Sequence, residues 1–580
     1  MEEAKKGIMN EDWLSFWLAI VIFAVSLFAF SGTDPLGWAL KTSPWTDSSK
    51  ALSTEGKTFH AAKGEITKIQ DNKVTIKKED GKEATLTVKD VTGLEVGQMY
   101  EKKGISGFAA LLLTYLALLV VMGAGAALLG ADIGKFIIAF TIVFWLSYLC
   151  WFIGHNAYLA ATDAKKFNIP WSLKLTGDGG FIVALIGGLI VGNFMPGLSK
   201  YLKEALRPEL YVKTGIGLMG ALLGIKAAEA FGLASAIMFR GLCAILEAYL
   251  IYWAVVYFVA RKYFKFSKEW AAPLASGISI CGVSAAISTG GAIRARPIIP
   301  IMVSSLVVIF AVIELLVLPF FAQTFLWKEP MVAGAWMGLA VKTDGAAFAS
   351  GAVVDSLVLA KAYSESGIKY EPGWILMAAS TTKLFIDIFI SIWAFILAYI
   401  WCAKIDCKPG QKMQASEMWR RFPKFVIAYA ATFAIMLMIA APNAPKIKPV
   451  TTEITKIKKE ITATEKQLAT VTDPAEQTAL NEKIKASKDK TKSLEAEIKG
   501  PQKTMSNAKT AAAGTNAFRV MFFVLTFFTI GVVSNFKQLW AEGIGKLAAV
   551  YLLCLFGFII WVGLIISWIF FHGVKPPIIG

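Results

Sequence analysis

The sequence predicts an all-α polytopic membrane protein, an inverted-repeat secondary transporter with broken helices, carrying a small β domain and an α-helical hairpin as insertions. Of its 580 residues, 56% are hydrophobic and 17% are charged, with a mean hydropathy of +0.56. Soluble domains are closer to one quarter charged. Charged residues gather in 46–103 and 446–513. The remaining sequence consists of apolar runs long enough to span a hydrocarbon core.

About thirteen apolar segments follow from these runs. The first begins after Lys5 and Lys6 and lacks a small-residue cleavage site, so we expect a membrane anchor and not a removed signal peptide. The expected segments are 13–32, 106–130, 134–155, 180–197, 210–228, 233–261, 269–293, 298–323, 331–354, 373–403, 422–441, 516–535 and 546–572.

The basic residues of three loops predict the orientation. These loops fall on one side of the membrane when the segments alternate, and the positive-inside bias makes that side cytoplasmic. We therefore expect a multi-pass protein of the cytoplasmic (inner) membrane, with the N-terminus inside and both insertions outside. The net charge of +17 has no compact basic face interleaved with aromatic residues, so no nucleic-acid partner is predicted. The loop residues are Lys200, Lys203, Arg207, Arg261, Lys262, Lys265, Lys268, Lys404, Lys408, Lys412, Arg420, Arg421 and Lys424.

The chain divides into five parts on this pattern. Residues 1–45 form the first span and a loop, 46–105 a small extracytoplasmic β domain, and 106–441 the transmembrane core. Residues 442–515 form the extracytoplasmic hairpin, and 516–580 the spans that complete the core.

The β domain is indicated by alternating apolar and polar residues in 64–78 around an Asp71-Asn72 turn. A second turn, Asp80-Gly81, precedes another alternating stretch. We expect a barrel of five strands with a structural or docking role, and a ligand-binding role as the alternative.

The hairpin is indicated by two runs of aliphatic residues at three-four spacing, separated by the helix-start signal Asp473-Pro474. Each arm would extend about 30 Å from the membrane. An oligomerisation arm or a protein-binding surface at 451–513 and a plain solvated insertion both remain open. The aliphatic residues are Ile454, Ile457, Ile461, Leu468, Val471, Leu480, Ile484, Leu494 and Ile498.

An internal similarity supports an inverted repeat. Residues 219–232 and 530–543 align without gaps and share glycines at both ends and a central lysine. The copies are seven segment steps apart, so they would cross the bilayer in opposite directions, as in many secondary transporters.

Two apolar segments contain small and polar residues that favour a broken helix. They are 275–293, which is rich in glycine and serine, and 334–352, which carries Lys342-Thr343-Asp344-Gly345 at its middle. Unwound backbone within a membrane is tolerated where it is buried in protein or lines a wet cavity. Its free amides attract anions and its free carbonyls attract cations. Close helix packing through small residues is the alternative.

Four ionisable residues lie deepest in the predicted spans, where charges are costly and tend to be functional. Lys342 and Asp344 flank one break, and Lys383 and Asp387 share a helix face. They could form internal salt bridges. In a transporter, the lysines would bind an anion, and the aspartates would carry a coupling Na⁺ or H⁺.

Other polar residues of the spans are assigned structural roles. Arg240, Glu247 and Glu314 are interpreted as packing or interface groups, while Arg294 and Arg296 would either attract anions or serve as loop residues. The six cysteines and three histidines form no disulfide framework and no zinc motif. No metal site and no cofactor are predicted.

Three stretches resemble the YeiH-like sulfate exporter family, within the cation:proton antiporter and bile-acid symporter superfamily. They are 187–196 with 215–225, the SICGVSAAI core at 279–287, and 334–353; the stretch 527–546 is similar to the family's last block. The resemblance implies an inverted-repeat transporter for small anions such as sulfate or sulfonates, and a homodimer. The chain differs where Lys342-Thr343-Asp344 replaces a His-Asp pair and Ile386 replaces an arginine.

The sequence therefore predicts a secondary active transporter in the lipid bilayer that exports or exchanges a small anion. Cation/proton antiport and a membrane sensor or assembly scaffold are the alternatives. An intramembrane enzyme is not expected, because neither HExxH nor GxSxG occurs. Ser279, Cys281, Gly282, Ser284, Lys342, Thr343 and Lys383 would bind the anion, and Asp344 and Asp387 the coupling Na⁺ or H⁺.

Overall fold

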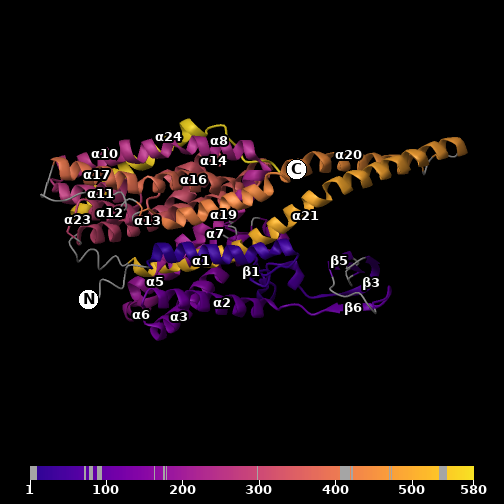
Figure 1. Ribbon diagram of the computed structural model, residues 1–580, viewed down its shortest axis with the longest axis horizontal. Helices are drawn as coiled ribbons and strands as arrows, with labels where there is room; N and C mark the ends of the chain where they lie inside the picture. Colours follow the sequence, from indigo (N-terminus) through magenta and orange to yellow (C-terminus); the bar gives the residue numbers. More distant parts are fainter. Residues whose placement is uncertain are drawn as a thin grey trace.

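The computed structural model is predominantly helical, with the long axes of most helices running in one direction (Figure 1). It describes residues 9–579 except 71–72, 78–82, 88–93, 162, 174, 176, 178, 297, 405–418, 420–421, 469–470, 472 and 535–544. Within the described part, eleven helices are long and apolar enough to cross a membrane. The prediction of a polytopic, mainly helical membrane protein is confirmed.

The spans include both single helices and helices in series. Some spans are continuous: α1 (Glu11–Ser26, followed by a 3-10 turn to Ser31), α2 (Gly107–Leu128), α3 (Ile133–Gly154), α7 (Pro208–Glu229), α13 (Ile298–Phe325), α15 (Asp344–Ser366) and α19 (Lys424–Ala440). Others join several pieces: α8 (Phe231–Gly241), α9 (Cys243–Leu246), the π-helix η7 (Glu247–Tyr252) and α10 (Trp253–Lys262); α16 (Trp374–Ile388) and α17 (Ile390–Lys404); and α23 (Gly545–Cys554), the π-helix η8 (Leu555–Ile559) and α24 (Ile560–Phe571).

Shorter helices complete the membrane part. They are α4 (Ala157–Ala160), α5 (Gly179–Phe194), α6 (Pro196–Tyr201), α11 (Lys268–Ser279), α12 (Gly282–Ala292) and α14 (Pro330–Ala340). Both predicted interruptions are present, between α11 and α12 and between α14 and α15. The expected segment 331–354 ends too early, because α15 continues to Ser366, where Gly367 adopts a left-handed conformation (φ +69°) that ends the helix.

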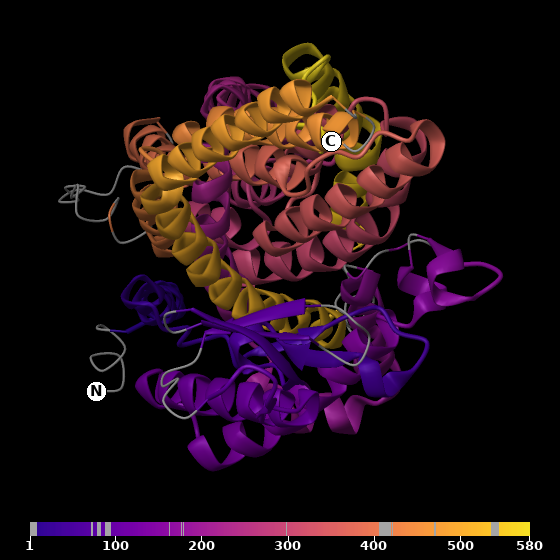
Figure 2. The same ribbon diagram turned by 90° about the vertical axis from the view of Figure 1, so that its right-hand side faces the viewer.

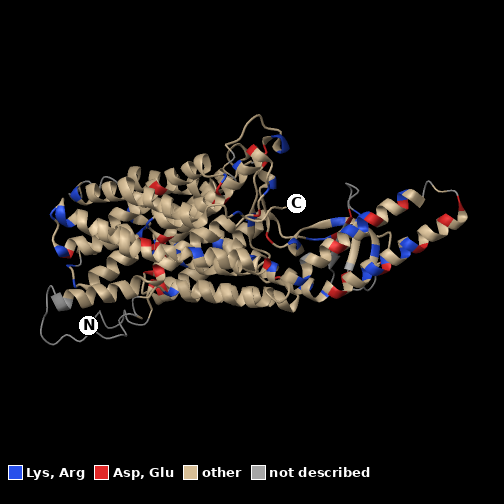
Figure 3. Ribbon diagram, turned by 90° about the horizontal axis from the view of Figure 1, so that it is seen from above, with Lys and Arg blue, Asp and Glu red and all other residues tan. Residues whose placement is uncertain are grey.

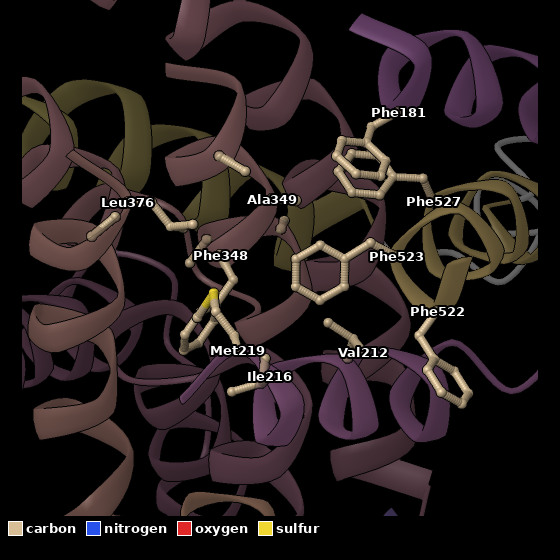
Figure 4. Packing of buried hydrophobic residues seen from close by; sticks show 14 of the residues in the cluster. Phe181, Val212, Ile216, Met219, Phe348, Ala349, Leu376, Phe522, Phe523 and Phe527 are labelled. Atoms are coloured by element: carbon tan, nitrogen blue, oxygen red, sulfur yellow. The ribbon is translucent and has the colours of Figure 1, made fainter. Parts of the chain in front are cut away.

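Helix α7 lies at the centre and is buried along most of its length. Aromatic side chains of α21 (Pro474–Val533) fill the space between α7 and α5 (Figure 4). Phe527 stacks on Phe181 of α5 with ring centroids 4.9 Å apart. A Cβ atom on Gly215 of α7 would lie 2.6 Å from the Phe523 ring, so this approach requires a glycine. The helices α2, α3 and α5 lie together on one side of α21 (Figure 2).

A four-stranded antiparallel sheet lies outside the helical body, with strand order β5-β4-β3-β6 (Figure 1). Its strands are β3 (Ala62–Gln70), β4 (Lys73–Lys77), β5 (Glu83–Thr87) and β6 (Met99–Lys102). Its small core contains Ile66, Val74 and Ile76. The predicted turn residues 71–72 and 80–81 lie outside the described part. A two-stranded sheet of β1 (Leu40–Thr42) and β2 (Leu52–Thr54) sits closer to the membrane helices.

Helix α20 (Ala444–Leu468) and the outer half of α21 lie antiparallel and project from the same end (Figure 1). Ile457, Ile461 and Ile484 form their buried seam. Three ion pairs of 2.8–2.9 Å cross between the helices: Lys458–Glu495, Lys488–Glu465 and Lys490–Glu453. Helix α21 has 60 residues and continues from this projection into the membrane part without a break at 515/516. Charged residues are dense on the projection, and smaller groups lie at the opposite end of the body and within it (Figure 3).

The second copy of the internal similarity ends beyond α21. Its residues 530–534 are described, while 535–543 lie outside the described part, as do loop residues 405–418 and 420–421 with several of the basic residues used for orientation.

Candidate functional site

The two interruptions meet in the interior of the helical body. The backbone amide of Gly282, the first residue of α12, donates a 2.6 Å hydrogen bond to the carbonyl of Lys342, between α14 and α15. A Cβ atom on Gly282 would lie 2.4 Å from Val307 Cγ1 and 3.1 Å from Thr343 Cγ2. Glycine therefore lets the two unwound stretches touch. We call this place the crossing.

Local sequence explains where the helices begin again. Thr343 is extended (φ −99°, ψ 146°) and its Oγ1 accepts a 3.2 Å hydrogen bond from the amide of Ala346, as an N-cap does. Asp344 then stands in the first turn of α15, where a negative charge complements the helix dipole. Cys281 is the extended N-cap of α12 but makes no side-chain capping bond.

Lys383 of α16 brings a positive charge to the crossing. Its Nζ donates a 2.8 Å hydrogen bond to the carbonyl of Ile280, at the C-terminal end of α11. The same Nζ lies 3.5 Å from Asp344 Oδ1 and 4.0 Å from Asp387 Oδ1. All three side chains are buried. The closer ion pair therefore joins α16 to α15, and the pair within α16 is the longer one.

The residues around Lys383 include more acidic side chains than basic ones. Cys281 Sγ and one oxygen each of Asp344 and Asp387 lie within 4.8 Å of one another, a spacing that a small cation could bridge. In the described structure, neither carboxylate oxygen of Asp387 has a hydrogen-bond partner. One ammonium thus faces two buried carboxyl groups and one thiol. With both aspartates ionised, the group would hold an unbalanced negative charge.

Lys342 contacts a second group of polar side chains, which includes Tyr252 and Glu314. Its Nζ donates to the carbonyl of Leu339 and lies 4.5 Å from the centroid of the Tyr252 ring. Its backbone amide donates a 3.0 Å hydrogen bond to Glu314 Oε2, and Tyr551 donates a 2.8 Å bond to Glu314 Oε1. Glu247 accepts a hydrogen bond from Tyr252.

These contacts supply partners for Glu247 and Glu314, which the sequence analysis interpreted as packing or interface groups. Both are fully buried and belong to the polar surroundings of the α14–α15 interruption. The sequence could not predict that these glutamates lie near Lys342, because no residue spacing relates positions in α13 and η7 to the α14–α15 interruption. A carboxylate in a membrane span was the one available signal.

The other polar residues singled out in the sequence differ in how deeply they are buried. Ser279 is buried at the end of α11, and its Oγ has no hydrogen-bond partner in the described structure. Ser284 is half-buried in α12. Arg296 is exposed and pairs with Glu269 through a 3.2 Å contact, and Arg240 donates to the carbonyl of Phe570. Neither arginine contact involves a residue of the crossing.

A buried polar chain next to the crossing was not predicted at all. The indole of Trp253 donates a 3.0 Å hydrogen bond to Ser276 Oγ, and Thr289 Oγ1 donates a 2.7 Å bond to the same oxygen. These bonds tie α10 to α11 and α11 to α12, and so hold the two halves of the first interrupted helix together.

Comparisons with known proteins agree with a membrane protein. The family model described as conserved hypothetical protein 698 matches residues 176–488. A UPF0324 membrane protein of Nitrosomonas europaea is 34% identical over 573 residues, covering 98% of this chain and 97% of that protein. The similarity therefore extends through both inserted segments.

Two further relatives cover shorter stretches. An uncharacterized protein of Archaeoglobus fulgidus is 42% identical over 209 residues, which are 36% of this chain and 91% of that protein. A UPF0324 membrane protein of Nitratidesulfovibrio vulgaris is 28% identical over 320 residues, which are 54% of this chain and 48% of that protein. No solved structure matches the chain. On the near full-length match and the family model, the chain belongs to the UPF0324 family of membrane proteins.

Proposed function

We propose that the protein is a secondary active transporter whose coupling ion, H⁺ or Na⁺, is carried at the crossing by Asp344 and Asp387. Lys383 is their counter-charge, and Cys281 lies beside them. The sequence resemblance to sulfate exporters points to a small oxyanion as the solute, moved across the cytoplasmic membrane.

The observation that carries this proposal is the charge imbalance at the crossing. Lys383 has two buried carboxyl groups within 4.0 Å, and Asp387 has no hydrogen-bond donor in the described structure. Removing an ionised group from water costs several kcal/mol even after the protein relaxes. A bound proton or Na⁺ would remove the excess charge. The free energy of this region therefore depends on whether the ion is bound.

The interrupted helices supply a way for ion binding to change the conformation. The halves α11 and α14 end at the crossing, and α12 and α15 begin there, joined by the Gly282–Lys342 hydrogen bond. Lys383 binds the carbonyl end of α11 and approaches Asp344 at the start of α15. Gain or loss of the ion would change the attraction between these two halves, which is the kind of event that alternating access requires.

Cation/proton antiport is the second candidate, and the balance of charges favours it. Four carboxyl groups, Glu247, Glu314, Asp344 and Asp387, surround the interruptions against two lysines. Lys383 and Lys342 already donate to the carbonyls of Ile280 and Leu339. An anion would therefore have to displace these contacts or use the amide ends of α12 and α15.

The inverted repeat and the placement of both insertions on the extracytoplasmic side of the membrane are also part of the proposal. The first repeat copy runs from the second half of α7 into the start of α8. The second copy begins at the end of α21, the helix that packs beside α7 (Figure 4). An enzymatic role is not proposed, because Ser279 Oγ has no general base bonded to it in the described structure.

Flux into proteoliposomes identifies the solute. The purified protein would be tested with radiolabelled sulfate, sulfite, thiosulfate, a sulfonate and Na⁺, under a pH gradient of either sign. We expect flux of at least one solute that responds to the gradient and is lost in Asp344→Asn. For an anion substrate, Lys342→Ala should weaken flux mainly through KM; for cation exchange, it should leave KM for Na⁺ unchanged.

Asp473→Asn is the matched control for these measurements. It removes one carboxylate from the helix cap of the hairpin, where an amide oxygen can cap equally well. It should transport like the wild type. Absence of flux for every solute in the wild type would contradict the proposal.

A further inference from the structure

A second buried group of ionisable side chains adjoins the α14–α15 interruption at Lys342. The group contains Glu247 and Tyr252 of η7 and Glu314 of α13. It also contains Lys342, between α14 and α15, and Tyr551 of α23. We propose that this group is a second proton-binding centre, with Glu247 as the residue that takes up and releases the proton.

The charge count requires a proton in this group. Glu247 and Glu314 are both 0% exposed, and Lys342 is 1% exposed. Lys342 supplies the one positive charge within the group, and Lys383 is the next cation that acts on Glu314. Two ionised carboxylates against one ammonium would leave a buried negative charge, which is strongly unfavourable. Protonation of one glutamate balances the group.

Hydrogen bonding indicates which glutamate carries the proton. Glu314 accepts two bonds, from the Lys342 amide at 3.0 Å and from Tyr551 at 2.8 Å, one on each oxygen. Donors on both oxygens favour the ionised form. Glu247 accepts a bond from Tyr252 on Oε1, while its Oε2 has no partner in the described structure. Glu247 is therefore the better site for the proton.

The backbone around Glu247 is irregular in a way that accompanies function. Glu247 begins the π-helix η7 and Tyr252 ends it, and the Tyr252 hydroxyl lies 2.9 Å from the carbonyl of Ile559, the last residue of the π-helix η8. Single π-helical turns inside α-helices are frequent at functional sites. A Cβ atom on Gly563 would lie 2.8 Å from the Tyr252 hydroxyl and 3.4 Å from Glu247 Oε1, so glycine provides room for this pair.

The backbone of Lys342 connects the two centres. Its amide donates to Glu314, and its carbonyl accepts from Gly282 at the crossing. A change of charge at the Glu247–Glu314 group acts on the same peptide segment that holds the interrupted helices together. This inference rests on the proposed function for its consequence: two ion equivalents, one at each centre, would be carried in each transport cycle.

Infrared difference spectra of the reconstituted protein, recorded between acidic and alkaline buffer, test the proposal without any transported solute. The wild type should show a protonated-carboxyl band that Glu247→Gln removes and Asp387→Asn leaves in place. Glu314→Gln removes the second carboxylate that faces Lys342, so the Glu247 band should remain but should require a more acidic buffer to develop. Glu482→Gln, at an exposed position of the hairpin, is the matched control and should change neither.

Tyr252→Phe keeps the test decisive if Glu247→Gln fails to fold. It removes the hydrogen bond to Glu247 and should shift the frequency of the same band without abolishing it. The proposal is overturned if Glu247→Gln retains every carboxyl band, or if Tyr252→Phe leaves all frequencies unchanged. Because no flux is measured, a protein that transports none of the solutes can still pass or fail this test.

Discussion

The amide of Gly282 and the carbonyl of Lys342 are 2.6 Å apart, although 60 residues separate them in the sequence. This bond joins the starts of two interrupted membrane helices, and Val307 packs against Gly282 so closely that no side chain fits. Asp344 and Asp387, proposed to carry the coupling ion, and their counter-charge Lys383 surround this junction. Its geometry therefore determines how tightly the two carboxyl groups and the lysine can approach.

Gly282→Ala should destabilise the protein and reduce transport. The added methyl would lie 2.4 Å from Val307 Cγ1 of α13 and 3.1 Å from Thr343 Cγ2, so it would push the start of α12 away from both. Overpacking of this kind costs about 1–3 kcal/mol. Thermal unfolding in detergent measures the effect. Gly123→Ala in α2, where nothing lies within 4 Å of the added atom, should leave the melting temperature unchanged or raise it.

Lys383→Ala should be strongly destabilising, because it leaves Asp344 and Asp387 without their cation. Loss of one partner from a buried ion pair costs about 3–5 kcal/mol. The double variant Lys383→Ala/Asp387→Asn should recover part of this loss, since the second change removes one of the uncompensated charges. A double-mutant cycle on thermal unfolding in detergent measures the coupling. Additive effects of the two changes would show that the residues do not interact.

Ile461→Asp should separate the two helices of the projecting hairpin while the membrane part stays folded. Ile461 packs in the buried seam with Ile457 and Ile484, and a carboxylate there would be buried without a partner. Limited proteolysis should cut the variant within 444–500 much faster than the wild type. Thr462→Asp, one residue along on the exposed face, should be cut at the wild-type rate.

Asp34→Asn should increase the stability of the folded protein at neutral pH and should leave its stability unchanged at acidic pH. Asp34 lies in the loop after α1, and burial raises the pKa of its carboxyl, partly offset by the hydrogen bond from Thr58. A raised pKa in the folded state means that folding favours the protonated form. The stability contributed by that proton is present at low pH and is lost as the pH rises through the folded pKa.

The measurement is the melting temperature of wild type and Asp34→Asn across a pH series. The difference between the two should grow as the pH rises above the ordinary pKa of aspartate, 3.8, and then level off. A constant difference at every pH would contradict the assignment of a perturbed carboxyl. Asp47→Asn is a suitable comparison, because the hydrogen bonds from Ser49 lower the pKa of Asp47 and the sign reverses.

The sequence was informative where local chemistry decides the structure. Apolar runs of membrane-spanning length predicted the spans, and Gly282 and Lys342-Thr343-Asp344 predicted both interruptions, because glycine and capping residues disfavour continuous helix. The sequence could not predict that Lys383 would approach Asp344 more closely than Asp387, four residues away on its own helix. It also could not show that Glu314 binds the Lys342 amide. Such contacts depend on how α13, α15 and α16 pack.

The π-helices and the length of α21 escaped prediction for a similar reason. A π-turn adds one residue to a helix without changing its composition, so Glu247–Tyr252 read as part of an ordinary apolar span. The charged outer half of α21 and its apolar inner half suggested two elements with a boundary near 515/516. The helix continues across this change in composition, and Gly514 and Thr515 are both helical residues within it.

Proton movement into proteoliposomes tests the central claim most directly. A trapped pH-sensitive dye would follow the internal pH while sulfate or Na⁺ is added outside, for the wild type, Asp387→Asn and Asp473→Asn. The wild type and Asp473→Asn should move protons with at least one of the two solutes or, with Na⁺ as the coupling ion, take up radiolabelled Na⁺ together with sulfate. Asp387→Asn should do neither. Proton movement in Asp387→Asn at the wild-type rate would show that the crossing does not carry the coupling ion.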